Sequence, residues 1–212
     1  MADHFLHGVE VVEIDNGPRP IRTVRSSVIG LVGTAPDADE HSFPLNTPVL
    51  IAGSRLEAAK LGATGTLPMA IDGIFDQVGA LVVVIRVAEG TTEAETQTHV
   101  LGGVDEAGQY LGLQALLAAQ SVAKVTPRIL IAPGFTHQRP VDPEDNTRQL
   151  ANPVVAELLG IAERLRAVII ADGPNTTDAA AIDYREDWGS PRIYVVDPHV
   201  KVMKNGAVVT EP

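Results

Sequence analysis

Polar residues follow several apolar segments of the sequence, at places where an α/β protein could carry out catalysis. Segments 128–134, 167–174 and 192–198 are each expected to form a strand that ends on Asp, Gly or Pro. Ligands of open parallel sheets bind at the carboxyl ends of the strands, so Asp172 would lie close to His137 on the neighbouring loop. Asp172 as an acid or metal ligand, with His137 as a base, is therefore the sharpest enzymatic hypothesis.

The same residues also have a purely structural interpretation. Asp, Gly and Pro end strands and form turns because of their backbone preferences. No G-x-S-x-G motif or similar nucleophile pattern accompanies Asp172 and His137. The sequence favours the structural interpretation, and a small α/β enzyme stays open as the alternative.

A glycine pair in the stretch SSVIGLVGTAP superficially resembles a phosphate-binding turn. Gly30 and Gly33 have G-x-x-G spacing, whereas a dinucleotide turn needs G-x-G-x-x-G and a P-loop needs Lys and Ser/Thr after its last glycine. Prolines at positions 36, 44 and 48 argue against a helix start behind them. We expect both to be structural glycines of a strand, at points where neighbouring backbone approaches closely.

The cysteine and histidine content gives little support for a metal site and none for thiol chemistry. The chain has no cysteine, and its six histidines stand at positions 4, 7, 41, 99, 137 and 199. Only His4 and His7 are close in sequence, which is too little for a metal site. We expect no metal and no cofactor.

The composition indicates a layered α/β protein without a nucleic-acid or membrane partner. Of its 212 residues 45% are hydrophobic but only 4% aromatic, so aliphatic side chains must fill the core. The net charge is −11, and the Lys/Arg clusters that bind nucleic acid or anionic membranes are missing. The longest apolar run, Gly79–Ile85, is too short to cross a bilayer.

Hydrophobic periodicity and turn signals predict alternating strands and helices. The expected strands are 26–33, 48–53, 80–87, 128–134, 167–174 and 192–198, with a terminal hairpin at 200–209. The expected helices are 54–62, 67–78, 107–122, 153–165 and 175–186, with a polar loop at 89–106. This order predicts an α/β fold whose layered sheet is mainly parallel and has helices on both faces.

The first residues are expected to form an extended N-terminal arm. Residues 7–14 read HGVEVVEI, and the turn signal DNGPRP follows at 15–20. A lone strand cannot bury its own apolar side chains, so it must pair with the rest of the fold or with another subunit. We therefore divide the chain into an arm at 1–20 and a core domain at 21–212.

Beyond these patterns, three stretches resemble the tail sheath proteins of contractile bacteriophages, in particular the short type of P2-like phages and R-type pyocins. They read HGVEVVEI, RPIRTVRSSVIGLVGTAPDAD and FPLNTPVLI, all within residues 7–51. Two later segments, at 101–135 and 166–182, are similar to the same family. The resemblance extends over essentially the whole chain.

The resemblance implies a structural protein and no enzyme. Sheath subunits stack as helical rings around a tail tube and contract to drive the tube through a cell envelope. The implied partners are other sheath subunits, the tail tube protein, the baseplate and the tail terminator. The implied location is the virion tail, assembled in the host bacterial cytoplasm.

The resemblance also implies a role for the N-terminal arm. Sheath arms exchange strands with neighbouring subunits, a form of β-augmentation. The apolar anchors of that exchange would be Val9, Val11, Val12 and Ile14. Pairing of this strand within its own domain stays open. Sheath proteins of this type continue past the equivalent of Pro212, so we expect the family's C-terminal domain and arm to be missing here.

Overall fold

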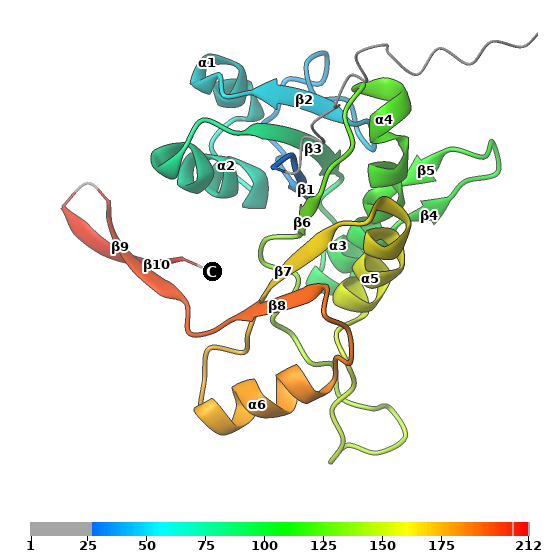
Figure 1. The fold of residues 1–212 in the computed structure, drawn as a ribbon, viewed down its shortest axis with the longest axis vertical. Helices are drawn as coiled ribbons and strands as arrows, with labels where there is room; N and C mark the ends of the chain where they lie inside the picture. Colours follow the sequence, from blue (N-terminus) through cyan, green and yellow to red (C-terminus); the bar gives the residue numbers. More distant parts are fainter. Residues whose placement is uncertain (1–26, 205, 212) are drawn as a thin grey trace, which may run out of the picture.

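A six-stranded sheet with the strand order β2-β3-β1-β6-β7-β8 organises the molecule (Figure 1). The structure is a computed structural model, and it describes residues 27–204 and 206–211. Neighbouring strands are parallel except at the edge pair β2 and β3, which is antiparallel. The predicted α/β class with a mainly parallel sheet and helices on both faces is confirmed.

The six strands predicted between residues 26 and 198 are present, with bounds that differ from the expected ones by a few residues, and the strand expected at 7–14 lies outside the described residues. The six sheet strands are β1 (Ile29–Thr34), β2 (Val49–Ala52), β3 (Leu81–Val87), β6 (Ile129–Ile131), β7 (Val168–Asp172) and β8 (Ile193–Val196). Two separate antiparallel pairs are β4 (Gly103–Val104) with β5 (Tyr110–Leu111), and β9 (Val200–Lys204) with β10 (Ala207–Glu211). The β9–β10 pair is the hairpin expected at the end of the chain.

The helices differ more from expectation. They are α1 (Arg55–Ala58) with the 3-10 turn η1 (Ala59–Leu61), α2 (Thr66–Gln77), α3 (Glu93–Leu101), the 3-10 helix η2 (Gly112–Ala118), α4 (Ala119–Val122), α5 (Pro153–Leu165) and α6 (Asp178–Glu186). None of the helices within the described ranges is long and apolar enough to span a membrane.

The polar loop predicted at 89–106 is wrong in its middle, where α3 forms. Its N-cap is Thr92, whose hydroxyl accepts from the Glu95 N–H at 3.1 Å, and the Glu95 carboxylate accepts from the Thr91 N–H at 2.7 Å. This is a variant of the capping box, so Thr92 and Glu95 were a readable signal. The helix buries only Thr96 and Val100, which explains why it has no clear apolar period.

The helix predicted at 107–122 is also wrong in part. The segment begins with β5 and continues as η2, and only its last turn, α4, is α-helical. Gly112 has φ 54° and packs against the backbone carbonyls of His99 and Val100, where a side chain would collide. This left-handed position separates the strand from the 3-10 helix.

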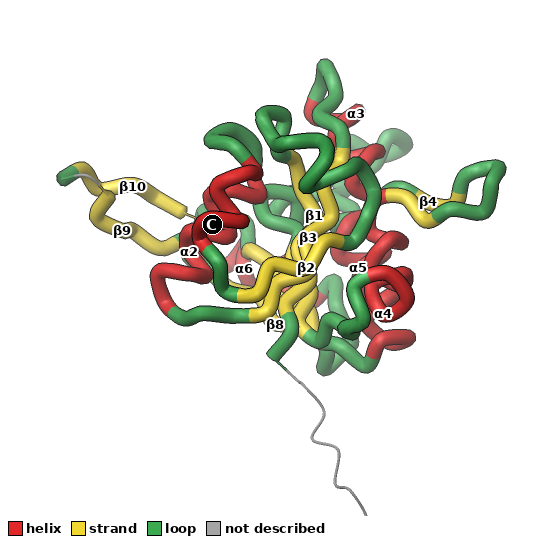
Figure 2. Tube along the Cα trace, turned by 90° about the horizontal axis from the view of Figure 1, so that it is seen from above, coloured by secondary structure: helices red, strands yellow, loops and turns green. Residues whose placement is uncertain are grey.

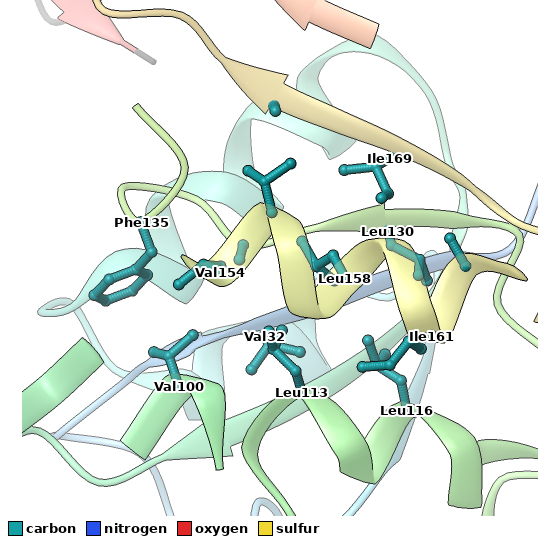
Figure 3. Packing of buried hydrophobic residues seen from close by; sticks show 14 of the residues in the cluster. Val32, Val100, Leu113, Leu116, Leu130, Phe135, Val154, Leu158, Ile161 and Ile169 are labelled. Carbon is teal, nitrogen blue, oxygen red and sulfur yellow. The ribbon is translucent and has the colours of Figure 1, made fainter. Parts of the chain in front are cut away.

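Two apolar clusters lie on opposite faces of the sheet. The larger one is sandwiched between the sheet and the group α3, η2 and α5, as Figure 3 shows for Leu113, Leu130, Leu158 and their neighbours. The smaller one lies under α2 and includes Leu31, Ile71 and Phe75. Seen along the sheet in Figure 2, α2 and α5 stand on opposite sides of the strands.

Gly30 and Gly33 lie inside the central strand β1 and are both buried. A Cβ on Gly30 would come within 2.8 Å of the Leu116 side chain, and one on Gly33 would collide with the Thr66 hydroxyl. They are structural glycines of a strand, as expected. The expectation of closely approaching backbone is wrong, because side chains from η2 and α2 occupy the space.

Candidate functional site

The carboxyl ends of β6, β7 and β8 bring together the polar residues that the sequence singled out. The loop after β6 is locked to the end of β7 by Thr136, whose side chain is 1% exposed. The Asp172 backbone N–H donates to the Thr136 hydroxyl at 2.9 Å, and that hydroxyl donates to the Asp172 carboxylate at 3.1 Å. Asp172 therefore holds two segments of backbone together.

Tyr184 of α6 also stabilises the loop that contains Thr136. Its side chain is fully buried, and its hydroxyl donates a short hydrogen bond to the Thr136 carbonyl. Burial, with smaller contributions from the charges of Asp172 and Asp187, raises the pKa of Tyr184 well above its ordinary value of 10.0. The phenol stays protonated at neutral pH and acts as a structural donor.

Asn152 fixes the other end of this loop. It is the N-cap of α5, and its side-chain oxygen accepts from the Val154 and Val155 N–H groups at 2.8 and 3.0 Å. Its amide nitrogen donates to the carbonyls of Phe135 (3.1 Å) and Gln138 (2.8 Å). Asn152 thus caps the helix that the sequence predicts at 153–165, and its second role, clamping the loop at 135–138, was not readable from the sequence.

His137 lies on this loop but does not form a pair with Asp172. Within the described residues, no hydrogen bond or ion pair joins the two side chains. The His137 ring instead faces the edge of the His199 ring, with the centroids 6.1 Å apart and the planes at 89°. The topology places His137 and Asp172 at the same end of the sheet, as predicted, without the base-to-acid contact that the enzymatic hypothesis requires.

Asp197, at the end of β8, also serves the local backbone. Its carboxylate accepts from the Asn175 N–H at 2.7 Å, and the Asn175 side chain accepts from the His199 N–H at 3.1 Å. A Cβ on Gly173 would come within 2.7 Å of the Asp197 Cβ, so a glycine is needed there. These contacts are those of interlocked strand-end turns.

The remaining sequence hypotheses concern metals and the N-terminal arm. Among the residues that the structure describes, no group of three or more His, Asp or Glu side chains could hold a metal ion. The strand-exchange anchors Val9, Val11, Val12 and Ile14, like His4 and His7, lie outside the described residues.

The β9–β10 hairpin offers a different kind of surface, suited to pairing with another strand. It forms a sheet of its own, with the antiparallel register Val200↔Glu211 to Lys204↔Ala207. A two-stranded hairpin is marginally stable alone, and further strands stabilise it. Four of its apolar side chains are exposed, namely Val200, Met203, Val208 and Val209.

Comparisons with known proteins point to one family. The family model described as tail sheath protein Gp18 domain III N-terminal region matches residues 26–87, a range that contains β1, β2 and β3. The chain is 38% identical to the tail sheath protein of Escherichia phage P2 and 38% identical to the major tail sheath protein of Serratia phage KSP20. These matches cover 93% and 94% of this chain and 48% of each relative. The chain thus spans about half the length of the curated relatives it matches, and the predicted resemblance is confirmed.

Proposed function

We propose that this chain, which is related to the tail sheath proteins along nearly its whole length, is a structural subunit of a contractile tail sheath. The observation that carries the proposal is the identity of 38% over 206 residues to the tail sheath protein of phage P2. In this role the subunit stacks in helical rings around a tail tube, and contraction of the rings drives the tube through a cell envelope.

The contacts at the strand ends support a structural role and no enzymatic one. The side-chain hydrogen bonds of Asp172, Asp197 and Tyr184 go to backbone groups or to the Thr136 hydroxyl. The alternative of a small enzyme using Asp172 and His137 lacks the pairing that proton transfer needs.

The proposal assigns partners and a place of assembly. Other copies of the sheath subunit are the first partners, followed by the tail tube protein, the baseplate and the tail terminator. Assembly takes place in the cytoplasm of the host bacterium, and the final location is the virion tail. Because each copy carries a net charge of −11, copies repel one another, and specific contacts such as main-chain hydrogen bonds have to hold them together.

Strand exchange supplies such contacts. In the proposed division, residues 1–20 form the arm and 21–212 the core, and Val9, Val11, Val12 and Ile14 anchor the arm on a neighbouring copy. The free edges of the β9–β10 hairpin are a suitable acceptor, because main-chain hydrogen bonds provide affinity while alternate side chains provide register.

Electron microscopy of the full-length gene product tests the proposal. We expect striated tubes, and the 212-residue chain alone is expected to remain a monomer or small oligomer in light scattering at rising concentration. A full-length product that never forms tubes under any salt condition would contradict the sheath assignment.

The arm is tested separately in the same assay. Changing Val9 and Val11 to Glu should abolish long tubes, because two charges would have to be buried between strands. The matched control is Leu56→Glu, at an α1 side chain that is already 82% exposed, and its tubes should be unaffected. Normal tubes from the arm variant would show that strand exchange does not join the subunits.

A further inference from the structure

Among the helices that the structure describes, in residues 27–204 and 206–211, none lies over one half of one sheet face. On the face that α2 covers, neighbouring residues on successive strands are Val84, Leu31, Ile131, Ile170 and Tyr194. Ile131 lies beside Ile170 because Leu130 and Ile169, the residues just before them, are paired. Val84 and Leu31 are fully buried, Ile131 and Ile170 are half-buried, and Tyr194 is 60% exposed. The cover provided by α2 therefore ends in the middle of the sheet.

The uncovered half forms an apolar groove of about 650 Å³. Its lining residues come from α2, from β9 and from the strands β1, β6 and β7, whose places in the fold Figure 1 shows. The strands supply the floor, α2 supplies one wall and β9 the other. Large apolar side chains line it from all three sides, among them Leu31 and Ile170 on the strands, Met69 and Ile74 on α2, and Val200 and Met203 on β9.

The charges at this groove are of one sign. Its charged lining residues are Asp76, which is paired with Arg55 at 2.7 Å, and Asp172. The Asp172 carboxylate accepts a hydrogen bond only from the neutral Thr136 hydroxyl among the described side chains. A segment that fits the groove combines an apolar face with a basic residue near Asp172.

We propose that this groove is the docking site of an amphipathic helix that belongs to the half of the tail sheath proteins outside the part matched by this chain. The inference rests on the proposed function. Parallel sheets are buried on both faces, and α2 already covers the neighbouring half in this way. The chain matches 48% of the length of its phage relatives, so they carry about as much sequence again to supply the helix.

A groove of this kind is also the place where a second copy or residues 1–26 could bind. A second copy is disfavoured because the acidic rim would face another acidic protein of net charge −11. An extended segment would leave its backbone groups unpaired over the sheet face, where only side chains are presented, whereas a helix satisfies its own backbone hydrogen bonds.

Cysteine labelling distinguishes these occupants, because the chain contains no cysteine. Ile170→Cys on the floor and Met69→Cys on the α2 wall report on the groove, and Leu56→Cys, which is remote and 82% exposed, is the control. The same three aligned positions are changed in the phage P2 tail sheath protein after replacement of any native cysteines. Both proteins are labelled with a maleimide over a series of dilutions that ends where light scattering shows monomers, and circular dichroism checks that each variant is folded.

We expect the groove cysteines to react at least tenfold faster in the 212-residue chain than in the phage P2 protein, with equal rates for the control. Benzophenone maleimide at the position of Met69 in the phage P2 protein should then cross-link to peptides outside the matched part. Equal groove rates in the two proteins would overturn the inference, and so would cross-links to the N-terminal segment. Protection in the 212-residue chain that disappears on dilution would overturn it in favour of a second copy.

The outcome is independent of the test for sheath assembly. Tubes without protection of the groove in the monomer would leave the proposed function standing and remove this inference. Protection of the groove without tubes would support this inference and contradict the proposed function.

Discussion

The two faces of the central sheet carry similar aliphatic side chains in very different surroundings. On one face Leu130, Ile169 and Ile193 are adjacent across three strands and are 0%, 0% and 4% exposed. On the other face the residues one position further along, Ile131, Ile170 and Tyr194, range from half-buried to 60% exposed. Residue type does not explain the difference, because both sets are large and apolar or aromatic.

The direction in which the chain crosses the sheet explains it. The connections β3 to β6, β6 to β7 and β7 to β8 all move the same way through the strand order, so right-handed crossovers place their helices on one face. Only the connection from β1 to β3 moves the opposite way, and it puts α2 on the other face. One face is therefore fully covered by this chain, and the other face is covered over half its width.

The largest expected effect comes from truncating one residue on each face. Leu130→Ala should lower the free energy of unfolding by about 3 kcal/mol, because it leaves a cavity in a closed core. Ile170→Ala, on the open face, should cost only about 1 kcal/mol, since water already reaches that side chain. Urea denaturation of both variants gives the comparison. Equal losses would mean that the open face is as well packed as the closed one.

The N-cap of α5, a helix on the fully covered face of the sheet, gives the next largest expected effect. Asn152→Ala should cost about 2 kcal/mol, because it removes the cap and leaves the buried carbonyl of Phe135 and the partly buried carbonyl of Gln138 without their donor. Thr177→Ala, at the exposed N-cap of α6, is the matched control and should cost about 1 kcal/mol. Thermal denaturation measures both. If the control loses as much as Asn152→Ala, the clamp on the loop contributes nothing.

The anchor of α2 on β1 is tested with two glycines. Gly33→Ala should destabilise by about 2 kcal/mol, because its Cβ collides with Thr66, whose hydroxyl accepts from the Thr34 N–H at 3.2 Å. Gly73→Ala on α2 meets nothing within 4 Å and should stabilise the chain by about 0.5 kcal/mol through helix propensity. Chemical denaturation measures both. A stabilising Gly33→Ala would show that α2 is free to shift on the sheet.

The smallest effect concerns the ionisation of Tyr184 behind the closed face. Its raised pKa means that the unfolded chain loses the phenol proton near pH 10 while the folded chain keeps it, so stability falls as the pH rises above about 10. Tyr184→Phe should cost about 1 kcal/mol at pH 7 and reduce this alkaline loss. Tyr194→Phe, at an exposed phenol, is the control and should leave the stability at pH 7 unchanged, and the urea midpoint of the wild type and of Tyr184→Phe across pH gives the comparison.

Local signals in the sequence were sufficient for most elements but not for the middle of the chain. The cap at Asn152 with Pro153 behind it, and the unbroken apolar run of β3, predicted their elements correctly. The prediction for segment 89–122 is wrong in part, and its missed helix α3 buries only Thr96 and Val100 and therefore lacks a readable apolar stripe. Gly112 separates β5 from η2 in the second half of this segment, and its left-handed backbone conformation results from its packing on the backbone of α3.

The strand-end residues show the same division between local and long-range information. That Asp172 and His137 would lie at one end of the sheet followed from the parallel topology. The hydrogen bonds from the Thr136 hydroxyl to the Asp172 carboxylate and from the Tyr184 hydroxyl to the Thr136 carbonyl could not be predicted in this way. They join residues 36 and 48 positions apart in the chain. No pattern of neighbouring residues contains such contacts.

The sequence by itself determined the α/β class, the lack of thiol chemistry and the relationship to sheath proteins, because each depends on residue types, local periodicity or similarity along the chain. The tertiary structure alone decided that Gly30 and Gly33 face side chains from η2 and α2, and that half of one sheet face is left open. The physical reason is that burial depends on which elements cross which strands, and the alternating side chains of a strand are equally apolar whether or not a helix lies above them.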